Sequence, residues 1–132
     1  MFRSKMKIRV ALIMLVLVLL GSVSAFAEYD QAKVVAVMRG NLGYIGEISS
    51  AAAAEEWVLA AQNLFAISEG MLGIMVYDPP RGTKADWDAT LMEFVKTAYL
   101  GIGACGAQDV EALQEVIAKL KGLNRQGHGD HK

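Results

Sequence analysis

Residues 109–123 read DVEALQEVIAKLKGL, and this stretch decides the fold class. Its apolar side chains recur every three or four residues, which is the period of one face of an α-helix. That face carries Val110, Leu113, Val116, Ile117, Leu120 and Leu123. Charged and polar residues fill most of the other positions, so the stretch predicts an amphipathic helix that needs a packing partner. The helix is expected to run from Asp109 to His128, with Gly127 and Gly129 fraying its end.

Three earlier stretches show the same period and predict three further helices. They run roughly over residues 30–49, 52–75 and 84–102. Their apolar faces carry Val34, Val37, Met38, Asn41, Ile45 and Ile48; Trp57, Ala60, Ala61, Leu64, Ile67, Ser68 and Met71; and Trp87, Leu91, Phe94, Val95, Ala98 and Ile102. No alternating run of β-branched residues indicates a strand. Four helices with short connections predict an all-α, antiparallel four-helix bundle.

Capping and helix-breaking residues predict where these helices begin and end. Residues 77–83 hold two prolines and a glycine, which cannot continue a helix. Thr83 is expected to cap the third helix, and Ser49 or Ser50 the second. The glycines at 101, 103 and 106 are expected to end the third helix.

The first predicted helix contains Gly40, Gly43 and Gly46, which form a smooth strip on one side. Each glycine lowers helix propensity by about 1 kcal/mol relative to alanine. Another helix or a flat ligand is therefore expected to pack closely against this strip.

The first 27 residues have the pattern of a secretory signal peptide. Four basic residues precede an apolar run over residues 10–20, and residues 25–27 read AFA, an A-x-A cleavage signal. Cleavage is expected after Ala27. The alternative is an uncleaved membrane anchor, but the run is short against the ~20 residues that span a bilayer. Residues 28–132 are then one small secreted domain.

The composition of residues 28–132 narrows the range of partners. Nine Lys and Arg residues stand against 14 Asp and Glu residues, a net charge of −5. An acidic domain without a basic patch argues against nucleic acid, and after signal cleavage it gives no reason to expect membrane binding. Cys105 is the only cysteine, which excludes a disulfide within the chain. In an oxidising compartment this thiol is either buried and inert or paired between two chains.

Three motifs, in order along the chain, resemble the cytochrome c prime family of periplasmic four-helix-bundle cytochromes. The first is VMRGNLG at residues 37–43, in the first helix. The second is Asp86-Trp87 at the start of the third helix, with Phe94 further along it. The third is the last helix, which matches without a gap over residues 109–128. The resemblance covers essentially all of residues 28–132 and implies the same bundle fold.

The family carries Cys-x-x-Cys-His on its last helix, where two thiols bond to the haem vinyl groups and the histidine ligates iron. Here Asn124 and Gly127 stand at the cysteine places, and only His128 fills its own place. Arg125 and Lys132 stand where the family tends to have basic residues. Neither asparagine nor glycine can form a thioether, so the usual covalent attachment is chemically excluded at this motif. A bound haem would be non-covalent.

Two interpretations stay open at the other positions that the resemblance marks. His128 either ligates the iron of a haem held by packing, or is a solvated residue in a polar tail. Val35 stands at the family's distal position, where an apolar side chain leaves iron free to bind a small gas; the alternative is that it packs in the core. Met38, one turn on, would be a sixth ligand or again a core residue. His131 with His128 is a weak metal pattern, and we expect no metal site there.

By resemblance, the protein is expected to be a periplasmic haem and iron protein that transfers electrons to an unidentified redox partner or binds a small gas. The alternative is a haem-free bundle that serves as a binding or structural module. Two histidines and one cysteine supply too few groups for catalysis, so we do not expect an enzyme. The family often pairs through its first two helices. The glycine strip and the four alanines at 51–54 predict a homodimer there.

Overall fold

The computed structural model describes residues 28–130, with side chains described as far as Gln126. It consists of four α-helices: α2 (Gln31–Ala53), α3 (Trp57–Ile74), α4 (Lys84–Ala107) and α5 (Val110–Asp130). No strand occurs within residues 28–130, so the predicted all-α class is confirmed. The predicted signal peptide lies outside the described residues.

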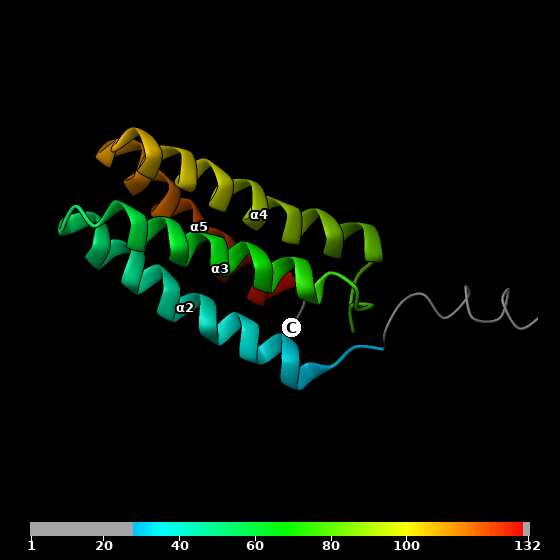
Figure 1. Cartoon of the computed structure of the whole chain (residues 1–132). Helices are drawn as coiled ribbons and strands as arrows, with labels where there is room; N and C mark the ends of the chain where they lie inside the picture. Colours follow the sequence, from blue (N-terminus) through cyan, green and yellow to red (C-terminus); the bar gives the residue numbers. More distant parts are fainter. Residues whose placement is uncertain (1–27, 131–132) are drawn as a thin grey trace, which may run out of the picture.

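The helices form an antiparallel bundle in which each packs against two neighbours (Figure 1). α3 lies between α2 and α4, and α5 closes the ring by packing against α4 and α2. All four helices contribute side chains that are completely shielded from solvent, among them Ile48, Leu64, Leu91, Phe94 and Leu120. The predicted apolar faces therefore form the core. Val110, in the first turn of α5, is an exception and is 38% exposed.

The connection between α2 and α3 differs from its prediction. Ser49 and Ser50 lie inside α2 rather than capping α3, and the Ser49 hydroxyl donates a hydrogen bond to the Ile45 carbonyl at 3.1 Å. The alanines that follow are strong helix formers and extend α2 to Ala53. The chain turns at Glu55, which has a left-handed φ of 57°. Glu56 caps α3 without a side-chain hydrogen bond.

The start of α4 is fixed by its cap and by contacts with the end of α3. The Thr83 hydroxyl accepts a hydrogen bond from the Asp86 amide at 3.1 Å, as predicted for a cap. The Trp87 indole Nε1–H donates to the Ile74 carbonyl at 3.3 Å. The Lys84 ammonium donates to the Met75 carbonyl. The Ile74 carbonyl also accepts a hydrogen bond from the Tyr77 amide at 3.3 Å, so carbonyl groups at the end of α3 are paired with both the following loop and α4.

The prediction that glycines end the third helix is wrong, because α4 continues through Gly101, Gly103 and Gly106 to Ala107. A Cβ on Gly101 would lie 2.8 Å from Leu64 Cδ1 and 2.9 Å from Val116 Cγ1. A side chain at position 101 would therefore clash, because α3, α4 and α5 approach one another closely there. The helix instead ends at Gln108, whose φ of 54° is left-handed.

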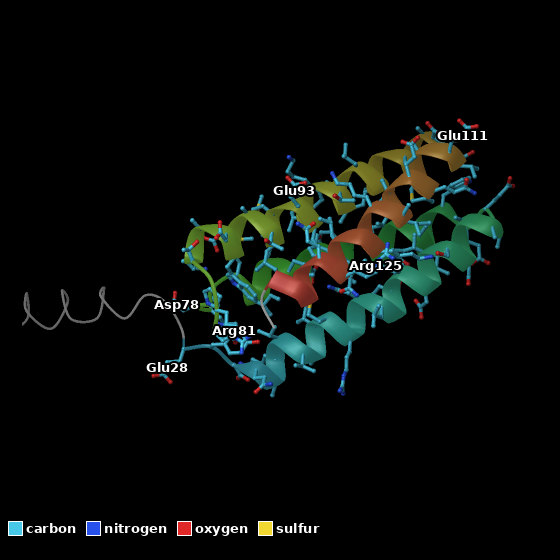
Figure 2. All side chains as sticks on the ribbon, turned by 180° about the vertical axis from the view of Figure 1, so that it is seen from behind. Glu28, Asp78, Arg81, Glu93, Glu111 and Arg125 are labelled. Atoms are coloured by element: carbon cyan, nitrogen blue, oxygen red, sulfur yellow. The ribbon has the colours of Figure 1, made fainter. Side chains whose placement is uncertain are left out.

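An ion-pair cluster joins α4 to α5 on the surface. Glu93 lies 3.3 Å from the Lys96 ammonium and 3.5 Å from that of Lys119 (Figure 2 labels Glu93). The hydrogen bond and charge of Lys96, with the charge of Lys119, lower the pKa of the Glu93 carboxyl. Exposed pairs of this kind add little stability, so the core holds the bundle together.

Candidate functional site

The residues marked by the resemblance lie on α2 and α5, which pack side by side along one edge of the bundle. We call this contact the α2–α5 seam. Val35 is 37% exposed, so the alternative that it packs in the core is wrong. Its neighbour Val34 takes the core position at 5% exposed. At 3.6 residues per turn, adjacent residues point about 100° apart, and here Val34 faces the core while Val35 faces outward.

Met38 and Arg125 lie at the margin of the seam. Met38 is partly buried and packs against the core, in line with its core interpretation. Arg125 is exposed on α5, on the side of the bundle that faces α2 (Figure 2). Among the described residues, neither of the two has a hydrogen bond or ion pair that defines a binding site.

Two asparagines are buried in the seam. Asn41 is 1% and Asn124 is 6% exposed. Ser49 and Ile117 line one groove between α2 and α5. Since these helices are antiparallel, Asn41, eight residues before Ser49, lies level with Asn124, seven residues after Ile117. The Asn41 Nδ2 and Asn124 Oδ1 atoms have no hydrogen-bond partner among the described residues.

The last positions of the motif are described only by their backbone. α5 runs through Gly127 and His128 to Asp130, two residues beyond the expected end at His128. The helix places the backbone of His128 one turn after Asn124. The His128 side chain and His131 lie outside the described part of the chain.

The chemistry of the seam does not fit a covalently attached haem. An amide stands at the first cysteine place, and glycine at the second has no side chain. Asn124 is also turned into the core, and like Asn41, Ile45 and Leu120 it is no more than 6% exposed. Around Asn41 and Asn124 the seam is therefore filled by side chains of the protein, whereas the groove at Ser49 and Ile117 lies further along it.

A groove on another side of the bundle was not predicted. It lies between α3 and α4, has a volume of about 550 Å³, and is lined by Trp57, Val58, Ala61, Gln62, Phe65, Ile102, Cys105 and Gly106. We call it the α3–α4 groove. Apart from the Gln62 amide and the buried Cys105 thiol, its lining is apolar. The sequence could have predicted an apolar outer surface here, because Val58 and Phe65 fall on the side of their helix away from the predicted core face.

Cys105 lies at this groove and is 3% exposed. It is a free thiol, and burial raises its pKa because the thiolate is harder to form away from water. The burial anticipated for the inert alternative is confirmed. A thiol that is shielded and protonated is a poor nucleophile.

The glycine strip of α2 has no packing partner within the described chain. A Cβ on Gly43 or Gly46 would meet nothing within 4 Å, and both glycines are exposed. The expectation that another helix of this chain covers the strip is therefore wrong. Of the alanines at 51–54, Ala51 and Ala52 are buried in the core and only the last two are exposed.

Within residues 28–126, no group of three or more His, Cys, Asp or Glu side chains is placed to hold a metal ion. Comparison of the chain with protein-family models, curated proteins and solved structures gives no match. The candidate sites on the described residues are the α2–α5 seam and the α3–α4 groove.

Proposed function

We propose that residues 28–132 act in the periplasm as a cytochrome c prime-like four-helix-bundle module that carries no covalently attached haem. The burial of Asn124 carries this proposal. A cysteine that holds haem must present its sulfur to the cofactor, whereas Asn124 presents an amide to the protein core. The module would act by binding rather than by catalysis, and the α3–α4 groove offers it an apolar concave surface.

A haem held without thioethers is the second candidate function. One observation favours it: α5 stays helical through His128, one turn after the buried Asn124. A bound haem would supply iron for a gas or for electron transfer, and His128 would be its ligand. Met38, partly buried on α2, would be a second residue available to hold it.

The test is expression in a host with complete c-type maturation. The purified protein should be colourless, a denaturing gel stained for haem peroxidase activity should be blank, and titration with free haem should give no Soret band. A stained protein band would overturn the proposal. A Soret band that His128→Ala abolishes would instead establish the second candidate.

The matched control restores the complete motif. Asn124→Cys with Gly127→Cys recreates Cys-x-x-Cys-His in the same chain. Covalent haem in this variant shows that the host and the cavity are competent, so the blank result for the natural chain is then due to its missing thiols. No attachment in the variant indicates that the seam stays closed to haem.

A further inference from the structure

The outer side of α3 is unusually apolar for a surface helix. Val58 is 72%, Phe65 50% and Leu72 43% exposed. These three recur at intervals of seven residues, so they form a straight stripe about 21 Å long. Glu69 is the only ionisable residue in the 18 residues of α3. An exposed helix of a water-facing bundle normally carries charges on this side.

The apolar stripe continues across the groove onto α4. Met92 is 40% and Tyr99 is 50% exposed, and they too are seven residues apart. α3 and α4 are neighbouring antiparallel helices (Figure 1). Since Val58 and Gly106 line the same groove, Phe65 lies level with Tyr99, and Leu72 level with Met92. We call these five large side chains, together with the groove, the α3–α4 face.

The area of this face matches what a stable dimer requires. An aromatic side chain has about 150–250 Å² of surface, so Phe65 and Tyr99 each expose about 100 Å². With the three aliphatic side chains, the face exposes on the order of 450 Å² of apolar area. A typical interface buries about 800 Å² on each partner, of which some 60% is apolar, or about 480 Å².

We propose that the α3–α4 face is the interface of a homodimer related by a two-fold axis. A second copy fits because a two-fold interface is self-complementary, and apolar residues at intervals of seven on two adjacent helices form the knobs and holes of helix packing. The groove would receive an aromatic side chain of the partner. This inference rests on the proposed function only in that the bundle is a module that acts by binding. It does not depend on whether the protein holds haem.

The α3–α4 face differs from the dimer interface that the resemblance implies, which would be formed by α2 and α3. Both interfaces include α3, but only the interface implied by the resemblance includes the outer side of α2. Leu42, 56% exposed on α2 beside the glycine strip, therefore distinguishes the two dimers.

The test is sedimentation equilibrium of the mature protein at tens of micromolar. The natural chain should be a dimer. Phe65→Lys and Tyr99→Lys should each weaken dimerisation by at least about 30-fold, as expected for central interface residues, whereas the matched control Leu42→Lys should leave the dimer unchanged. All three positions are exposed, so far-UV circular dichroism should show the same helix content in each variant.

A monomeric natural chain, or a dimer lost in Leu42→Lys but kept in Phe65→Lys, would overturn the inference. So would a monomer that binds phosphatidylcholine vesicles through Phe65, because the face would then contact lipid. Cross-linking gives an independent readout: in a Cys105→Ala background, Phe65→Cys should form a disulfide-linked dimer under mild oxidation, and Leu42→Cys should not. Loss of the dimer leaves the haem assays unaffected, so the two proposals fail separately.

Discussion

Replacing Gly101 with alanine should destabilise the bundle, although alanine is the better helix former. The new Cβ would lie 2.8 Å from Leu64 Cδ1 and 2.9 Å from Val116 Cγ1. Leu64 is completely buried and Val116 is 8% exposed, so both methyl groups belong to the packed core. Overpacking a core costs about 1–3 kcal/mol, whereas the gain in helix propensity is about 1 kcal/mol. We expect a net loss of about 1 kcal/mol in the free energy of unfolding.

Gly103→Ala, two residues further along α4, is the matched control. Gly103 is exposed, and a Cβ there meets nothing within 4 Å, so only the propensity gain applies. Its free energy of unfolding should rise by about 0.5–1 kcal/mol. Urea denaturation measures both changes, and the Tm should move about 4–8 °C per kcal/mol in opposite directions. Equal stabilisation by the two substitutions would refute the argument from close packing.

Three further predictions concern buried amides, the thiol and a helix end. Replacing both Asn41 and Asn124 with leucine should raise the free energy of unfolding by about 1 kcal/mol or more, because two unpaired buried groups are removed. Chemical denaturation measures this change, and a double variant less stable than the natural chain would contradict the prediction. Burial raises the pKa of Cys105, so above about pH 8.5 the unfolded chain loses a proton that the folded chain keeps, and stability falls. Cys105→Ala should show a shallower decline between neutral pH and about pH 10. Gln108→Gly should raise the Tm, with a gain of about 1 kcal/mol, because glycine adopts φ 54° without steric cost; Gln108→Ala serves as its control.

The sequence predicted the fold through the positions that the core must occupy. Leu113, Leu120, Leu64 and Phe94 fall on helical faces, and burial of such faces is the main favourable term in folding. The helix ends were harder to predict because local propensity competes with packing. Gly101 reads as a helix breaker, yet the close approach of three helices keeps it inside α4.

The candidate sites were predictable only in part. The stripe of α5 reaches Asn124 four residues after Leu120, so its inward position follows from the helical period. The helical period also predicts that Val58 and Phe65 lie on the outer side of α3. It does not reveal that α4 leaves a groove beside them, because that depends on the register between two helices. Nor could it show that the Asn41 and Asn124 amides lie level and partly unpaired.

The hydrogen bond from Trp87 to the Ile74 carbonyl joins two helices that follow one another in the chain. Its partners are only 13 residues apart, so the α3–α4 hairpin closes a short loop at small entropic cost. The seam between α2 and α5 instead joins the first and last helices of the described chain, so from the cost of loop closure we expect it to form last. Asn41 and Asn124 would therefore lose water in the final step of folding. An intermediate with three packed helices and a hydrated pair of amides is what rapid-mixing hydrogen exchange should detect.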